Sequence, residues 1–172
     1  EEVIRNNLII DEGDPFNEIL FNKSVNNIQS LGIFKKVKTD IKDGSNNSFK
    51  EIDINVEERP TGEISVTAGF GTTGETIGAG IKENNFLGKG IKLNTNFEIT
   101  SETIKGQFIY AKPNFNYSDN TLFTSLKSST SDFLTDSGYK TSEIGFSFGT
   151  KFEQFQNIFL SPEIDFLIED LE

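Results

Sequence analysis

Apolar and polar residues alternate along most of this chain of 172 residues, from Gly62 to its last residue. The clearest run is residues 91–99, where Ile, Leu, Thr, Phe and Ile take every second position and Lys, Asn and Glu stand between them. This period of two is that of a β-strand with one apolar and one polar face. Seven such runs, the last at residues 158–168, are separated by short turns without a helical pattern. They predict an antiparallel sheet.

The first 60 residues have a different, mixed pattern. Residues 1–9 are expected to form a short helix. Asp14 is a good N-cap and Pro15 a good first residue for a second helix, whose apolar side chains recur at three-and-four spacing. Gly32 is placed to end this helix in the left-handed conformation.

Two alternating runs, 34–41 and 49–56, follow the second helix, with a turn expected at residues 43–47. The apolar face of the second run consists of Ile52, Ile54 and Val56. The order helix, helix, strand, strand indicates a small α+β unit with its own apolar core.

The pattern changes to strict alternation at residues 57–62, where charged residues are followed by Pro and Gly. A change of period next to chain-breaking residues marks a domain boundary. We therefore predict two domains, residues 1–60 and residues 61–172.

The distribution of phenylalanine favours a membrane sheet. Of 17 Phe residues, 13 lie after residue 62, isolated among Ser, Thr, Asn and Gly. Tilted membrane strands need about 9–11 residues, and the apolar faces of these runs carry no Lys or Arg, which is costly against lipid. A soluble β-sandwich, whose strands also alternate, is the alternative. Because seven strands cannot close a barrel in lipid, we expect the chain to be an internal piece of a longer protein.

The composition argues against several functions. The net charge of −11 and the pI near 4.5 disfavour binding to nucleic acid, which requires a basic surface. The chain has neither Cys nor His, so disulfides, thiol chemistry, histidine bases, zinc–histidine sites and a Ser-His-Asp triad are excluded within it. The residue counts do not exclude a catalytic Ser–Lys pair, but no motif singles one out. We expect no enzyme activity, no metal and no cofactor.

Two local motifs have ordinary structural explanations. Residues 69–74 match the dinucleotide-binding pattern GxGxxG, but a strand follows where that motif needs a helix, so a hairpin turn is expected. The acidic pairs Asp40 with Asp43 and Glu57 with Glu58 lack calcium-loop spacing and are expected on a solvated surface.

Several motifs resemble the BamA family, which assembles barrel proteins in the bacterial outer membrane. Around the boundary, the resemblance lies in a joint, a hairpin at residues 69–74 and a turn. The joint consists of Arg59, Pro60, Thr61 and Gly62 after Glu58, and the turn of Asn85, Phe86, Leu87, Gly88, Lys89 and Gly90. Residues 4–5, 12–13, 24, 31–34 and 37 resemble the last POTRA domain of the family, and residues 112–115 its next periplasmic turn.

The resemblance implies the fold class: a partial α+β periplasmic POTRA domain, followed by about seven strands of an antiparallel transmembrane β-barrel. It places residues 1–60 in the last POTRA domain, with the opening strand of that domain before Glu1, and residues 61–172 in a 16-stranded barrel of the outer membrane. The implied partners are unfolded outer-membrane protein clients, periplasmic lipoprotein subunits and outer-membrane lipid.

The expected functional group is the backbone of a strand edge. In the first barrel strand this edge consists of Glu63, Ile64, Ser65, Val66, Thr67, Ala68, Gly69 and Phe70. Its small residues would weaken a seam, so that a client strand can pair there; alternatively, they accommodate a bend at the barrel mouth. A second edge, carrying Ile52, Ile54 and Val56, would pass clients along by strand addition. The alternative function is a pore, either porin-like or for two-partner secretion.

Overall fold

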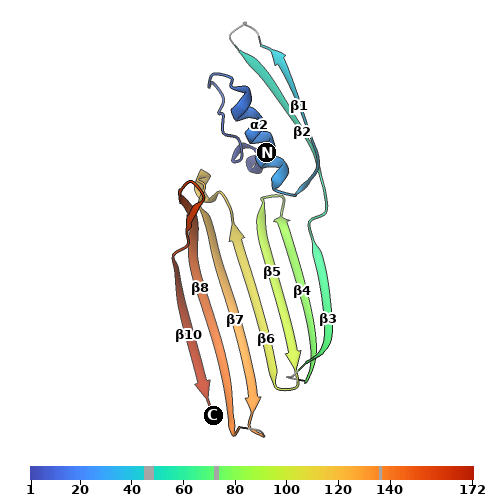
Figure 1. The fold of residues 1–172 in the computed structure, drawn as a ribbon, viewed down its shortest axis with the longest axis vertical. Coiled ribbons are helices and arrows are strands. Elements are labelled where there is room, and N and C mark those ends of the chain that lie inside the picture. The colour runs from blue at the N-terminus through green and yellow to red at the C-terminus, as the bar shows by residue number, and fades with distance from the viewer. Residues whose placement is uncertain (45–48, 72–73, 136) are drawn as a thin grey trace. The chain divides into compact units, whose positions relative to one another are not determined.

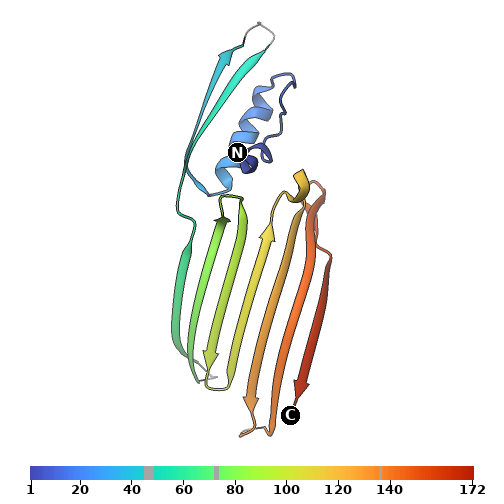
Figure 2. The same ribbon diagram turned by 180° about the vertical axis from the view of Figure 1, so that it is seen from behind.

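The computed structural model describes residues 1–44, 49–71, 74–135 and 137–172. Within these ranges the chain divides into two compact units, Glu1–Pro60 and Thr61–Glu172. Figures 1 and 2 show the ribbon from opposite sides. Two predicted turns extend beyond the described residues: residues 45–47 of the turn at 43–47, and Thr72 and Thr73 of the hairpin.

The first unit packs helix α2 (Glu18–Ser30) against strand β1 (Phe34–Asp43), which pairs with β2 (Lys50–Glu58). The buried apolar residues are Phe21, Ile28 and Ile33. Ser24 is buried beside them; its hydroxyl donates to the carbonyl of Leu20 (2.9 Å) and accepts from the N–H of Ile9 (2.8 Å). This pair of hydrogen bonds holds the segment before α2 on the helix.

The predicted end of the first helix and the predicted start of the second were wrong. Helix α1 covers only Glu2–Arg5, and α2 begins at Glu18 with Asn17 as N-cap. Asn17 has extended backbone angles, and its side-chain oxygen accepts from the N–H groups of Ile19 (3.0 Å) and Leu20 (3.2 Å). Asp14 instead accepts from the N–H of Asp11 at 3.0 Å and closes a turn before the helix. The predicted end is confirmed, because Gly32 follows the helix with φ +68°.

The predicted hairpin of the first unit is confirmed. Strands β1 and β2 are antiparallel, and the apolar side chains of one stand opposite those of the other. The pairs are Val37 with Val56, Thr39 with Ile54 and Ile41 with Ile52.

The second unit is one antiparallel sheet drawn as a single layer in Figure 1. In the described ranges its order is β3-β4-β5-β6-β7-β8-β10, and the short β9 pairs with the end of β8. The bounds are β3 (Glu63–Gly71), β4 (Gly74–Phe86), β5 (Ile91–Thr100), β6 (Thr103–Lys112), β7 (Thr121–Phe133), β8 (Tyr139–Phe155), β9 (Ile158–Leu160) and β10 (Glu163–Leu171). A short 3-10 turn, η1 (Phe115–Tyr117), precedes β7. The sheet is open, with β3 and β10 as its outer strands.

The prediction of one strand over residues 158–168 was wrong. The chain leaves β9 at Ser161 and Pro162 and enters β10 at Glu163. Proline has no N–H to donate to a neighbouring strand, whereas its carbonyl accepts from the N–H of Thr150 at 3.1 Å. Apolar and polar residues alternate across this break as they do within a strand, so the sequence pattern did not indicate it.

The strand register places the predicted apolar faces together. Directly opposite pairs connect every neighbouring pair of strands in the described sheet on this face. These pairs are Ile64 with Ile81, Ile77 with Ile99, Ile99 with Ile104, Phe108 with Leu126, Leu126 with Phe146, and Phe146 with Phe166. One side of the sheet is thus continuously apolar and the other is mainly polar.

This apolar face has almost no protein cover. Of the large apolar side chains described in the second unit, Ile91 is buried, whereas Ile64, Phe97, Ile144 and Ile168 are each more than half exposed. Among the helices described, none is long and apolar enough to cross a membrane.

Candidate functional site

Strand β3 has a free edge. Its residues pair with β4 along their whole length, from Glu63 opposite Lys82 to Gly71 opposite Gly74, and no other strand of the described ranges pairs with it. Every residue of β3 is exposed, and Ile64 and Phe70 are 82% and 88% exposed. The unpaired N–H and C=O groups of such an edge can accept another strand.

Side chains contribute little to holding β3 on β4 at the polar face. Each of four successive pairs on that face contains a glycine: Ser65 with Gly80, Thr67 with Gly78, Gly69 with Thr76, and Gly71 with Gly74. By contrast, β7 and β8 are joined by side chains, because the hydroxyls of Ser125 and Ser147 lie 2.7 Å apart and Thr124 donates to the carbonyl of Ser147 at 2.8 Å. On its polar face, strand β3 therefore depends mostly on backbone hydrogen bonds.

The four joint residues fall in both units. Arg59 belongs to the first unit, where its N–H donates to the carbonyl of Ile33 (3.1 Å) and its Nε to that of Gly32 (2.6 Å). The guanidinium thus lies at the C-terminal end of α2, where a cation is favourable. Pro60 closes the first unit, and Thr61 and Gly62 open the second.

The predicted turn between β4 and β5 is compact. The N–H of Gly88 donates to the carbonyl of Asn85 (2.9 Å), and that of Lys89 to the carbonyl of Phe86 (3.2 Å). The Asn85 side chain accepts from the N–H of Gly90 at 2.8 Å. Leu87, with φ +57°, adopts the left-handed conformation that is uncommon outside glycine.

Glu83 was not singled out in the sequence, yet it connects the joint to this turn. Its Oε1 accepts from the hydroxyl of Thr61 and from the N–H of Asn85, the latter at 2.7 Å. A carboxylate two residues before a turn amide is a recognisable local signal. The contact with Thr61, 22 residues away, has no signal in the sequence.

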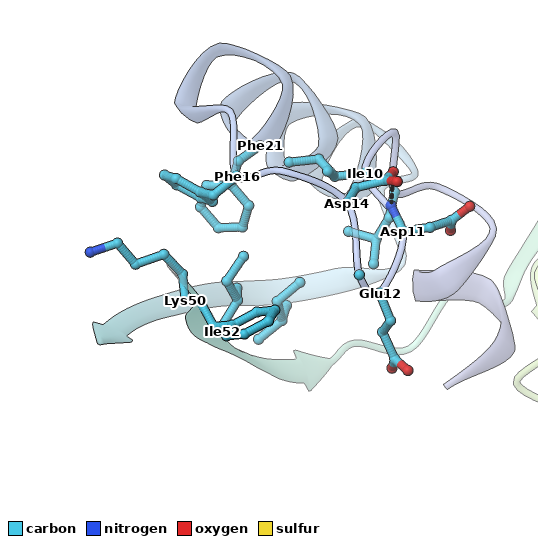
Figure 3. A pocket seen from close by; sticks show the side chains of 12 residues that line it. Ile10, Asp11, Glu12, Asp14, Phe16, Phe21, Lys50 and Ile52 are labelled. Carbon is cyan, nitrogen blue, oxygen red and sulfur yellow. Dashed lines mark hydrogen bonds between the residues drawn. The ribbon is translucent and has the colours of Figure 1, made fainter. Parts of the chain in front are cut away.

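The second predicted edge lies in the first unit. Within the described residues β2 pairs only with β1, so its other edge is free. Ile52, Ile54 and Val56 are half-buried. A cleft of about 240 Å³ lies beside β2. Figure 3 shows its lining, with Phe16 and Phe21 on one side and Ile52 on the other. Asp11, Glu12 and Asp14 lie at its acidic end.

Four acidic residues of β1 and β2 form ion pairs at the surface: Asp40, Asp43, Asp53 and Glu57. Asp40 and Asp53 stand directly opposite each other, and Lys42 Nζ lies 3.4 Å and 2.7 Å from their carboxylates. Hydrogen bonds to Asp53 and Asp40 raise the pKa of Lys42, and the hydrogen bond from Lys50 lowers the pKa of Asp43. Over the ranges that the structure describes, no cluster of three potential metal ligands occurs.

A comparison with protein families gives a match for the first unit. Residues 1–59 match the POTRA family model, described as a surface antigen variable number repeat. The chain therefore combines a POTRA match with an antiparallel sheet of amphipathic strands.

The curated relatives are outer membrane protein assembly factors by name. The chain is 31% identical over 108 residues to the putative outer membrane protein assembly factor of Treponema pallidum, covering 59% of this chain and 13% of that protein. It is 26% identical over 117 residues to the outer membrane protein assembly factor BamA of Neisseria meningitidis serogroup B, covering 67% and 15%. The resemblance to the BamA family is thereby confirmed, although the chain spans only a small part of these relatives.

Solved structures support the same fold. BamA from Haemophilus ducreyi lacking POTRA domains 1–3 superposes with a TM-score of 0.85 at 21% identity, covering 99% of this chain and 33% of that one. CdiB from Acinetobacter baumannii gives a TM-score of 0.59 at 13% identity, covering 95% and 35%.

Proposed function

We propose that this chain is part of an outer-membrane protein assembly factor. Residues 1–60 form its last periplasmic POTRA domain, and residues 61–172 the first strands of a barrel in the bacterial outer membrane. The observation that carries this proposal is the continuous, exposed apolar face that runs from β3 to β10. A surface of this kind needs lipid, because water contact with so much apolar area is costly.

In this proposal the working group is the free edge of β3. A client strand pairs with the backbone of residues 63–70, and the weak attachment of β3 to β4 lets the edge adapt. No acid–base chemistry is involved. The turn at residues 85–90 faces the periplasm, and periplasmic lipoprotein subunits dock on the first unit.

Disulfide trapping tests this proposal. In the full-length protein, Cys is introduced at Ser65 or Thr67, and a second Cys in the last strand of a nascent outer-membrane protein. A crosslink is expected from either position. The matched control is Asn94→Cys on β5, because strands flank β5 on both sides and leave no edge to pair with. If no crosslink forms at Ser65 or Thr67 while solutes cross the reconstituted barrel, a pore is the better account.

The free edge of β2 is proposed as a second client contact. Two observations support this proposal: the edge backbone of β2 is unpaired in the described residues, and an apolar cleft lies beside it. The opening strand that the family resemblance implies before Glu1 would compete for this edge. Asn55→Cys, at an exposed position of β2, tests whether a client strand or the protein's own upstream strand pairs with this edge. A crosslink to the client supports the proposal, whereas a crosslink solely to the protein's own upstream segment refutes it.

A further inference from the structure

The carboxylate of Glu83 contacts two segments of the chain, residues 61–62 and the turn at Asn85. The Thr61 hydroxyl and the Asn85 N–H both donate to its Oε1. A Cβ added to Gly62 would lie 3.2 Å from its Oε2, so the chain passes this carboxylate closely just before β3 begins. Asn85 in turn accepts from Gly90 and closes the turn between β4 and β5. The start of β3 is therefore fastened to that turn through Glu83.

The other end of β3 is held by the chain itself, because Gly71 pairs with Gly74 at the start of β4. From Ser65 to Gly71, each polar-face pair with β4 contains a glycine. Along this stretch the Ser65 hydroxyl donates to the carbonyl of Gly80, but the bond is long, at 3.5 Å. Strand β3 is thus held by Glu83 near Glu63 and by the hairpin at Gly71, whereas side chains on the polar face add little between these two points.

We infer that Glu83 is a positioning residue that holds the Glu63 end of β3 in place, so that the strand keeps its register while its free edge is exposed to a client. The edge is then offered to an incoming strand in one register. Register matters because a slip by one residue exchanges the two faces of a strand, which would turn the apolar side of a client away from lipid. This inference rests on the proposed function of β3 as the receiving edge.

The geometry provides a matched pair of variants at this position. Both hydrogen bonds end on the same oxygen of Glu83, so Glu83→Gln keeps an acceptor for both, whereas Glu83→Ala removes it. Glu153→Ala is the control: Glu153 Oε1 accepts from the N–H of Asn157 at 2.6 Å, which is the same type of bond in the β8–β9 turn, away from β3.

The first measurement is amide hydrogen exchange of the full-length protein in lipid bilayers, without client. In the unmodified protein, the amides at the Glu63 end of β3 that pair with β4 should be protected. In Glu83→Ala, the protected amides at the Glu63 end should exchange about tenfold faster, the effect of losing a hydrogen bond to a charged group. Glu83→Gln should stay near the unmodified rate, and Glu153→Ala should leave β3 unchanged. Equal rates in Glu83→Ala and the unmodified protein would overturn the inference.

The second measurement is the register of the client crosslink at Ser65→Cys, scanned against successive Cys positions in the last client strand. In the unmodified protein and in Glu83→Gln, one Cys position of the client strand should dominate the crosslinks. In Glu83→Ala, client positions two residues to either side of it should crosslink as well. A single unchanged position in Glu83→Ala would refute the positioning role. If exchange responds as expected but no client crosslink forms at all, the proposed function fails while the anchoring of β3 by Glu83 stands.

Discussion

The rings of Phe146 in β8 and Phe166 in β10 stack with their centroids 6.4 Å apart and their planes at 29°. The two residues are directly opposite in register, yet they remain 42% and 62% exposed. Their contact therefore joins the strands sideways, and over the described ranges no second layer covers them. An apolar surface arranged in this way is suited to hydrocarbon.

Charge on this face should be costly, whereas charge on the opposite face should be tolerated. Phe166→Lys is expected to destabilise the folded full-length protein in bilayers by about 2–4 kcal/mol if the residue lies near the bilayer centre. Asp165→Lys introduces the same side chain one residue earlier, on the polar face, and should have a much smaller effect. Urea unfolding in vesicles measures both, and equal losses would speak against lipid contact at Phe166.

Strengthening the β3–β4 pair should slow client assembly. A Cβ at Gly78 would meet the Phe97 carbonyl oxygen at 3.4 Å and Thr67 Cβ at 3.7 Å, which are ordinary contacts. Gly78→Ala should therefore fit and stabilise the strand by about 0.5–1 kcal/mol. We expect slower amide exchange in β3 and a lower rate of client insertion into vesicles.

Gly69→Ala is the comparison, since a Cβ there would meet nothing within 4 Å and should strengthen the pairing less. An insertion rate that rises in Gly78→Ala would contradict the role given to the weak attachment of β3.

Arg59 should stabilise the first unit through the carbonyls at the end of α2. Arg59→Ala removes the hydrogen bond from Nε to Gly32 and is expected to cost about 0.5–1.5 kcal/mol. Arg59→Lys should recover little of this, because a lysine lacks the planar guanidinium geometry. The urea midpoint of the first unit in the full-length protein measures the change. A midpoint unaffected by Arg59→Ala would show that solvent replaces this bond at no cost.

Lys42 should hold the β1–β2 hairpin together by separating two like charges. Lys42→Gln leaves Asp40 opposite Asp53 without a cation, so amide exchange in the hairpin should become faster at neutral pH and low salt. Because the pKa of Lys42 is raised in the folded state, its contribution is fully present below the ordinary lysine pKa and is lost as the pH rises through the higher folded value.

The pair is exposed, so added salt should shrink the difference between Lys42→Gln and the unmodified protein. Lys35→Gln, which removes one ion pair to Glu57 at 2.8 Å, is the control and should matter less. A difference that persists unchanged at high pH would show that the charge of Lys42 is not its cause.

The two faces of the sheet were predictable from the sequence because alternation is a local property. Residue 97 faces the same side as residue 99 in any regular strand, and the register then brought all apolar faces together. The antiparallel order followed from the short turns. The family resemblance rested on motifs at those turns, where backbone conformation restricts the residue type.

The features that could not be predicted from the sequence depend on contacts between distant segments or on a choice between two suitable residues nearby. Asp14 and Asn17 are both good N-caps, and the choice of Asn17 became visible only in the structure. The break at Pro162 was concealed because alternation runs through it. Glu83 was missed because its partner Thr61 is distant in sequence.

In the proposed barrel, alternate side chains from β3 onward contact lipid. The most direct test is a nitroxide label at Phe97 and, separately, at its neighbour Asn96 in the full-length protein in bilayers. We predict that the label at residue 97 collides frequently with oxygen and rarely with a water-soluble nickel chelate, and that the label at residue 96 shows the reverse. A label at residue 97 that is open to the chelate, or closed to both reagents, would contradict the account.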